Sequence, residues 1–492
     1  MTNKSIKINA LMNIIKQVCS ISFPLITFPY ISRVLGSENY GKYNFGISIV
    51  NYFSLIAALG ISNYAIREGA RIRERKQEFE RFSNEIFSIN MITTTISYIF
   101  LFMILIIFPR LYGYSKLILL QSTIIIFTTI GVDWINSIYE DYTYITLRYI
   151  IFQIISIILL FILVKHPNDY FKYAFIVVLA SVGANVLNIF HIRKYVKIKF
   201  ILNMNFSKHI IPMIILFCNS LAVTIYVNSD TTLLGLIENN EIVGLYSIAV
   251  KIYMVIKQLL NAMIIVVIPR LSLLIANDEW EKYNNLINMI FKICLTLILP
   301  IIVGLFILSK DIILVVGGEQ YVNGYMALRI LSVALFFSVF ACFFTNSILL
   351  INRKEKYFLK ATILASITNL LVNFIAIPMM SLNGAALTTV IAEFIVLITA
   401  IYYSKGDYKL YNIRPLLFSC ICGCMSVMIV CLFLQYRVLN TMYRISASII
   451  LSMILYGAIM ILFKNEVIMQ ILCDIIAKIK NKINEGSKKN IS

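Results

Sequence analysis

Stretches of about twenty consecutive apolar residues recur along almost the whole chain, and no other feature limits its possible folds so strongly. A helix of that length crosses about 30 Å of hydrocarbon. Only 14% of the residues are charged and 60% are hydrophobic, whereas an ordinary soluble domain carries about 25% charged residues. Spanning β-barrels are excluded, because their strands would alternate over about ten residues. The sequence therefore predicts an all-α integral membrane protein with about fourteen transmembrane helices.

The basic residues predict how these spans are oriented. Lysine and arginine gather in the cytoplasmic connections of membrane proteins. With the N-terminus inside, well over half of the 43 lysines and arginines fall on the cytosolic side. We therefore predict a multi-pass protein of the bacterial inner or plasma membrane with both termini in the cytosol. The predicted spans are 11–31, 44–62, 84–108, 116–137, 147–164, 172–190, 210–234, 242–269, 286–308, 325–351, 359–380, 384–403, 415–434 and 444–463.

The same basic connections explain the net charge of +19, so nucleic acid is not expected as a partner. Most of the nine cysteines lie inside apolar runs, where cysteine behaves as a small hydrophobe. The three histidines, His166, His191 and His209, fall in predicted connections and form no motif. We predict no metal site and no cofactor.

Short motifs repeat in the two halves of the chain at nearly one offset. The pairs are Gly41-Lys-Tyr43 with Gly244-Leu-Tyr246, Arg67 with Arg270, and Gly183-Ala184 with Gly384-Ala385. The repeat predicts an N-terminal six-helix bundle in residues 1–200, a C-terminal six-helix bundle in 201–410, two additional transmembrane helices in 411–464 and a cytosolic basic tail in 465–492. An even number of spans gives both halves the same orientation, an architecture of transporters that bind substrate between the halves.

One face of the predicted span 242–269 is polar. A single arc of about 120° contains Lys251, Lys257, Gln258 and Asn261, when each residue turns the helix by about 100°. Ionisable residues inside a span are costly and usually face a bundle interior or a wet cavity. Both lysines lie well away from the span ends, where snorkelling would explain them. We therefore predict that Lys251, Lys257 and Asn261 bind substrate.

Three further cations are candidates for the same cavity. Lys16 lies on a polar face of the span 11–31, although it is near enough to the cytosolic end to snorkel. Arg33 and Arg329 lie near the outer ends of their spans, where interfacial anchoring is the alternative to substrate binding. A cavity lined by these residues would be net positive and would favour an anionic or strongly polar substrate.

Two carboxylates are candidates for ion coupling, since a carboxylate inside the membrane can take up a proton or a cation. Glu393 lies near the middle of the span 384–403, and a structural salt bridge or hydrogen bond is its alternative role. Asp230 lies near the outer end of the span 210–234.

Several short motifs are typical of one transporter family. They are Phe28-Pro-Tyr-Ile-Ser-Arg33-Val-Leu-Gly36, Tyr40-Gly-Lys-Tyr43, Ala65-Ile-Arg67-Glu68, Asp133-Trp134, Ile145-Thr-Leu-Arg148, Leu234-Gly235 and Pro269-Arg270-Leu-Ser272. Through them the chain resembles, over nearly its whole length, the polysaccharide repeat-unit flippases (the Wzx type, for O-antigen and capsule) of the multidrug/oligosaccharidyl-lipid/polysaccharide exporter superfamily. One departure is Ile135–Ile138, where family members often have an aromatic pair and a glycine.

The resemblance implies two six-helix bundles in a MATE-like V that work by alternating access. It implies a flippase that carries undecaprenyl-diphosphate-linked oligosaccharide repeat units from the cytosolic to the outer leaflet of the bilayer, for surface polysaccharide biosynthesis. Lysines and arginines in a low-dielectric cavity would bind the diphosphate through charge-assisted hydrogen bonds. A polymerase and a chain-length regulator of the same pathway are the protein partners that this function implies.

Other functions remain open at this point. A lipid II flippase of the same superfamily fits the composition equally well. A MATE-type small-molecule antiporter would more naturally have an acidic cavity, against which Lys16, Lys251 and Lys257 argue. A membrane polysaccharide polymerase would need a catalytic constellation on a sizeable outer loop, and the longest outer connection, 309–324, is short. The sequence contains no convincing catalytic constellation, so we predict a transporter rather than an enzyme. It also has no Gly-rich nucleotide-binding loop, so we do not expect this chain to drive transport with ATP.

Overall fold

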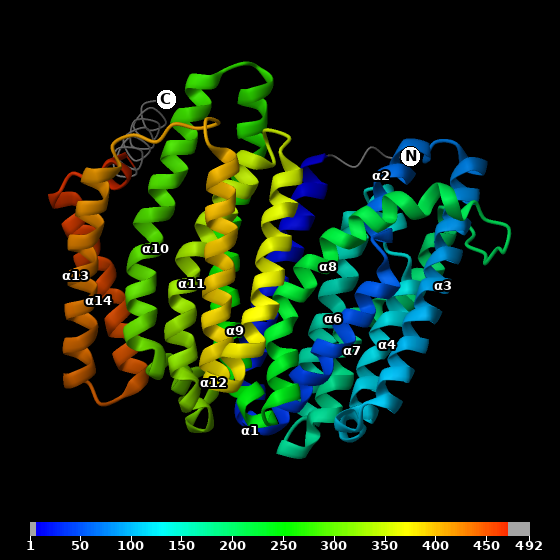
Figure 1. Cartoon of the computed structure of the whole chain (residues 1–492), viewed down its shortest axis with the longest axis horizontal. Coiled ribbons are helices and arrows are strands. Elements are labelled where there is room, and N and C mark those ends of the chain that lie inside the picture. Colours follow the sequence, from blue (N-terminus) through cyan, green and yellow to red (C-terminus); the bar gives the residue numbers. More distant parts are fainter. Residues whose placement is uncertain (1–5, 471–492) are drawn as a thin grey trace, which may run out of the picture. The chain divides into compact units, whose positions relative to one another are not determined.

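A computed structural model describes residues 6–470, and every regular element in that range is helical (Figure 1). The α-helices are α1 (Ile6–Ala58), α2 (Ile61–Ile72), α3 (Lys76–Ile107), α4 (Ser115–Gly131), α5 (Trp134–Ile138), α6 (Tyr142–Leu163), α7 (Tyr170–His191), α8 (Phe206–Ile237), α9 (Asn240–Ala276), α10 (Trp280–Gly317), α11 (Tyr325–Phe344), α12 (Glu355–Ser404), α13 (Ile413–Arg437) and α14 (Thr441–Leu462). Short 3₁₀ segments at Pro109–Tyr114, Pro167–Asp169, Ile192–Lys194 and Glu319–Gly324 and a π turn at Thr345–Leu349 lie between them. Most of the predicted basic tail, residues 471–492, lies outside the described range.

Twelve helical stretches within residues 6–470 are long and apolar enough to cross a membrane. Two of them are unusually long because each consists of two spans joined at a break in the backbone. Gly36 (φ 74°, ψ 170°) interrupts α1, and Ser381 (φ 51°, ψ −130°) interrupts α12. Each break separates two of the predicted spans, so these two stretches account for four spans and the twelve correspond to the fourteen predicted. The all-α transmembrane fold predicted from the sequence is confirmed.

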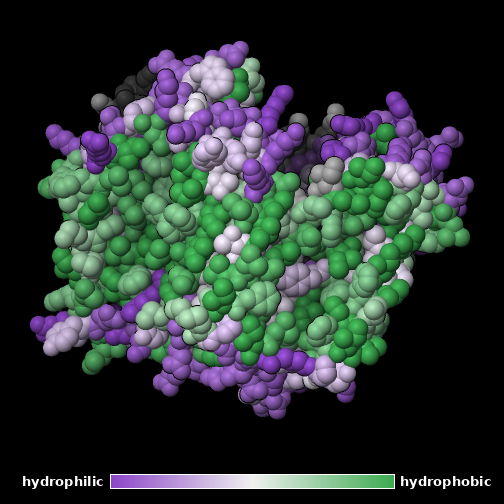
Figure 2. Space-filling model, viewed as in Figure 1, coloured by the Kyte–Doolittle hydropathy of each residue, from purple (hydrophilic) through white to green (hydrophobic). Residues whose placement is uncertain are grey.

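Large apolar side chains stay exposed along the helical spans. Figure 2 shows hydrophobic residues over the middle of the long helices and hydrophilic residues gathered at their ends. Val266, Leu371 and Met379 have exposed fractions of 77%, 61% and 78%. Exposed apolar area is unfavourable in water by roughly 25 cal/mol per Å², whereas lipid tails cover it without that cost. The surface of the spans therefore suits a bilayer.

The chain forms two compact units that do not follow the order of the sequence. The first unit contains the residues up to Ile248 together with Val316–Tyr321 and Ser366–Ala385. The second contains Ala249–Val315, Val322–Ala365 and the residues from Ala386 onward. Helices α9 and α12 each contribute to both units. The two sequence halves of six spans each remain a prediction.

In the first unit the two copies of the repeated glycine motif pack against each other. A Cβ atom added to Gly41 of α1 would lie 1.8 Å from the carbonyl oxygen of Asn240, at the start of α9. A Cβ atom on Gly244 of α9 would lie 2.0 Å from the carbonyl oxygen of Ser37 in α1. Only glycine permits backbones to approach this closely. The repeat seen in the sequence therefore has a steric reason at these two positions.

We expect Gly41→Ala to lower the free energy of unfolding by about 2 kcal/mol or more, because α1 and α9 must separate to admit the methyl group. Gly304→Ala is the matched control, since a Cβ atom there meets nothing within 4 Å. The measurement is the melting temperature of each purified variant in detergent, followed by size-exclusion chromatography. Equal melting temperatures for the two variants would contradict the close contact at Gly41.

Candidate functional site

A buried ion pair in the second unit joins Lys257 of α9 to Glu393 of α12. The exposed fractions of their side chains are 18% and 5%. Tyr253, one helical turn before Lys257, donates its hydroxyl to the same Glu393 oxygen at 2.9 Å. The Lys257 ammonium also lies 5.5 Å from the centre of the Tyr253 ring. The structure thus brings together a residue predicted to bind substrate and a residue predicted to couple ions.

Two other predicted residues on α9 keep unused hydrogen-bonding capacity. Lys251 is half-buried and makes no ion pair or side-chain hydrogen bond within the described part of the chain. The side-chain oxygen of Asn261 is buried and also accepts no hydrogen bond there. Buried polar groups normally have partners, so such groups within a span suit a polar ligand. Gln258, which shares their predicted face, is exposed.

Asp230 lies at the centre of a buried polar cluster in the first unit. Its carboxylate accepts hydrogen bonds from the amide groups of Asn369 and Asn373 at 3.1 Å and 2.6 Å. The hydroxyl of Tyr246 donates to its other oxygen at 2.8 Å. The Ser229 hydroxyl donates to the side-chain oxygen of Asn369 at 2.6 Å. Helices α8, α9 and α12 therefore meet at this carboxylate.

The three donors described here for Asp230 are neutral groups. Two amides and a phenol stabilise a carboxylate by hydrogen bonds without cancelling its charge. Asp230 is only 5% exposed, and Asn369 and Asn373 are 1% and 0% exposed. The carboxylate oxygens are hard ligands of the kind that small cations prefer, whereas the two asparagines turn their NH₂ groups toward the carboxylate. A proton or a small cation at Asp230 would bind to a carboxylate oxygen in place of one of these donors.

The predicted cations of the first unit have separate surroundings. Lys16 is half-buried on α1, and its ammonium lies 5.7 Å from the centre of the Tyr149 ring on α6. Arg33 is exposed near the break at Gly36. It lines a cavity of about 340 Å³ together with Glu38 and Glu241. The contacts described here for these two cations do not include Asp230.

Arg329 of α11 is held against α10 in the second unit. Its Nε group donates to the Phe306 carbonyl oxygen at 3.1 Å and to the Ser309 hydroxyl at 3.0 Å. The guanidinium group also lies 5.0 Å from the centre of the Tyr325 ring. These contacts give Arg329 a role in joining two helices.

The sequence did not indicate two other polar clusters, both in the first unit. His209, expected in a connection, is buried in the first turn of α8, where it contacts Glu85 and Tyr64 at 2.8 Å each. Arg148 of α6 forms an ion pair with Asp133, two residues that also belong to the family motifs. A histidine without a motif gives no sequence signal for its partners, and the motifs that contain Asp133 and Arg148 did not show that these two residues pair.

A helical chain of many spans with a lysine and a carboxylate buried inside them suits a membrane transporter. The chain belongs to the family of polysaccharide biosynthesis proteins, whose model matches residues 6–275. It is 25% identical over 404 residues to an O-antigen transporter of Escherichia coli (strain K12), covering 80% of this chain and 96% of that protein. It is 24% identical, with the same coverage, to the capsular polysaccharide biosynthesis protein CapF of Staphylococcus aureus.

Solved structures of two transporters share the fold. The lipid II flippase MurJ, in an inward closed conformation, superposes with a TM-score of 0.75 at 18% identity, covering 93% of this chain and all of that one. An inward-facing multidrug resistance transporter of the MATE family superposes with a TM-score of 0.61 at 15% identity, covering 80% and 97%. At these identities the likeness concerns the fold alone.

Proposed function

We propose that the protein is a flippase that moves undecaprenyl-diphosphate-linked oligosaccharide repeat units from the cytosolic to the outer leaflet by alternating access. The surface polysaccharide would be an O-antigen or a capsule. The family and the names of the two relatives support this substrate class. A diphosphate joined to sugars cannot cross hydrocarbon unaided, because its charges and hydroxyls would lose their hydration.

The unpartnered Lys251 is the observation that carries the proposal. A lysine inside a span needs an anion close to it, and no residue in the 6–470 range supplies one to Lys251. A diphosphate would supply it through charge-assisted hydrogen bonds. The free oxygen of Asn261, further along α9, would accept a sugar hydroxyl. We assign substrate binding to Lys16, Arg33, Lys251, Lys257, Asn261 and Arg329.

Coupling is assigned to Glu393 and Asp230. Glu393 holds Lys257, so protonation of the carboxylate would release a cation for the substrate. Asp230 would bind a proton or a small cation within its ring of neutral donors. These assignments give the transport cycle two candidate coupling carboxylates, one in each compact unit.

The two sequence halves, residues 1–200 and 201–410, would be the bundles that alternate, with 411–464 as two appended helices. The protein would reside in the bacterial inner or plasma membrane with both termini in the cytosol. We expect reporter fusions at Tyr195 and Asn239 to report the inside and the outside respectively, because of the bias of basic residues. Both reporters on one side of the membrane would rule out this topology.

The test of the function is export of lipid-linked oligosaccharide in cells that lack the native gene. We expect Lys251→Ala to abolish export. Lys251→Arg should keep part of it, because binding a diphosphate requires a positive charge and does not require the planar guanidinium group of arginine or exclude it. Lys251→Glu should be worst through repulsion. Lys310→Ala is the control, because Lys310 is an exposed lysine of α10 to which we assign no role. Normal export by Lys251→Ala at matched membrane expression would remove Lys251 from the binding site.

A further inference from the structure

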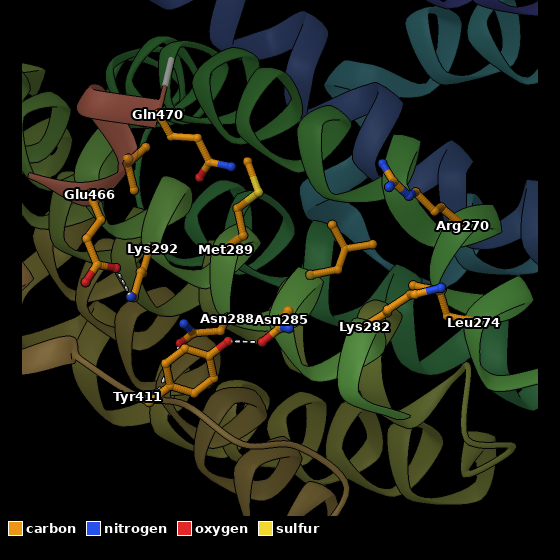
Figure 3. Close-up of a pocket in the computed structure, with 12 residues that line it drawn as sticks. Arg270, Leu274, Lys282, Asn285, Asn288, Met289, Lys292, Tyr411, Glu466 and Gln470 are labelled. Carbon is orange, nitrogen blue, oxygen red and sulfur yellow. Dashed lines mark hydrogen bonds and ion pairs between the residues drawn. The ribbon is translucent and has the colours of Figure 1, made fainter. Parts of the chain in front are cut away.

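A cavity of about 560 Å³ lies within the second unit, where α9 ends and α10 begins (Figure 3). The connection between α12 and α13 and the segment that follows α14 complete its wall. None of the residues to which we assign substrate binding or coupling lines this cavity. Its lining combines cations and amides with the apolar side chains of Leu274, Leu286 and Met289.

Lys292 of α10 stands at one side of the cavity with only 5% of its side chain exposed. Its ion-pair partner is Glu466, whose side chain is 57% exposed. An ammonium group at that depth requires an anion, because it has lost most of its hydration. The exposed carboxylate is a replaceable partner, since it regains its own hydration when it leaves.

Two amide groups beside Lys292 are oriented as donors. The backbone N–H of Tyr411 donates to the side-chain oxygen of Asn288 at 3.1 Å, and the Tyr411 hydroxyl donates to the side-chain oxygen of Asn285. A backbone N–H can only donate, so the Asn288 oxygen must face it and the NH₂ group is left to donate elsewhere. When the Tyr411 hydroxyl donates to the Asn285 oxygen, the NH₂ group of Asn285 is also left to donate.

The opposite side of the cavity is also cationic. Figure 3 places Arg270 and Lys282 across from Lys292, with the two asparagines between them. Lys282 pairs with Glu279 at 2.9 Å. Arg270 is exposed and has no ion pair or hydrogen bond with another residue of the described range. The groups with spare hydrogen-bonding capacity here are thus mostly donors, which suits an anion with several acceptor oxygens.

We propose that this cavity binds a phosphate-bearing anion, and that the head group of an anionic phospholipid is its source. Arginine, lysine and amide NH₂ groups together match the acceptor oxygens of a phosphate. The apolar residues of the wall would cover the glycerol and the first acyl carbons of a lipid, whereas a free phosphate would gain nothing from them. The phosphate displaces Glu466 from Lys292 when it binds.

The test is lipid binding to the purified full-length protein in detergent, followed by native mass spectrometry with phosphatidylglycerol or phosphatidylcholine. We expect phosphatidylglycerol to be retained in preference to phosphatidylcholine. Arg270→Gln should weaken its binding about tenfold, through loss of a charge-assisted contact. Glu466→Gln should strengthen binding, because it removes the competitor for Lys292. Lys405→Gln is the matched control, since Lys405 is an exposed lysine outside the lining and should leave binding unchanged.

Inorganic phosphate separates the two sources of the anion. Competition of phosphate with bound phosphatidylglycerol would confirm that the head-group phosphate is recognised, whereas phosphate binding without any lipid preference would reject the lipid source. Lys282→Gln serves as the second variant if Arg270→Gln aggregates on size-exclusion chromatography. Equal retention of the two lipids without phosphate binding would overturn the site, and so would equal effects of Arg270→Gln and Lys405→Gln.

Discussion

Lys257→Ala is expected to lower the free energy of unfolding by about 3–5 kcal/mol, because it leaves the Glu393 carboxylate buried without its cation. Glu393 is 4% exposed, so water cannot replace the lost ammonium group. Tyr253 would remain as a neutral donor to the carboxylate. The measurement is the melting temperature of the purified variant in detergent, together with its yield in the membrane fraction.

The double variant Lys257→Met, Glu393→Gln separates structure from transport. Neither new side chain carries a charge, so most of the stability should return. Export should not return, because the proposed coupling requires a carboxylate that can bind and release a proton. Recovery of both stability and export would reduce the pair to a structural contact. Wild-type stability of Lys257→Ala would contradict the ion pair itself.

Asp230→Leu is expected to cost about 3 kcal/mol or more, because Asn369, Asn373 and Tyr246 lose their acceptor together. The loss of an acceptor by a buried N–H or O–H group costs about 1–3 kcal/mol. Asp230→Asn should lower the free energy of unfolding less than Asp230→Leu does, because asparagine keeps an acceptor oxygen and the shape of the side chain. It should nevertheless abolish dependence of transport on an ion gradient, because the charge is lost.

Glu78→Gln is the control for the Asp230 variants, because the Glu78 side chain is 50% exposed and its salt bridge with Arg75 is on the surface. We expect it to change the melting temperature little. The two readouts are thermal stability in detergent and substrate export with and without an imposed proton or sodium gradient. Gradient-dependent export by Asp230→Asn would exclude this carboxylate from coupling.

The sequence predicted the spans because a bilayer imposes a simple rule of length and polarity on each helix. The breaks at Gly36 and Ser381 fall between predicted spans, because each apolar run ends once it is long enough to cross the bilayer. The repeated glycines were recognised as motifs, but their contact with the backbone of α1 and α9 required three dimensions. The local sequence pattern therefore predicted the helices and their number, but it did not predict how they pack.

The candidate site shows the same limit. Helical periodicity grouped Lys251 and Lys257 on one helix. It could not show that, among the residues the structure describes, Lys257 has a carboxylate partner and Lys251 has none. That partner, Glu393, lies on α12, far from Lys257 in the sequence. The sequence alone does not show which residues of distant helices are close in space. Asn369 and Asn373 gave no signal either, because a neutral amide in a span has many structural uses.

The most direct test of the proposed function is transport by the purified protein in liposomes. Undecaprenyl-diphosphate-linked oligosaccharide is placed in the inner leaflet, and its appearance outside is measured with a lectin or a glycosidase added to the medium. We expect the wild-type protein to expose the oligosaccharide, and Lys251→Ala at equal protein density to expose no more than protein-free liposomes. Failure of the wild-type protein to move this lipid, while it moves lipid II or a small organic cation under the same conditions, would contradict the proposed substrate.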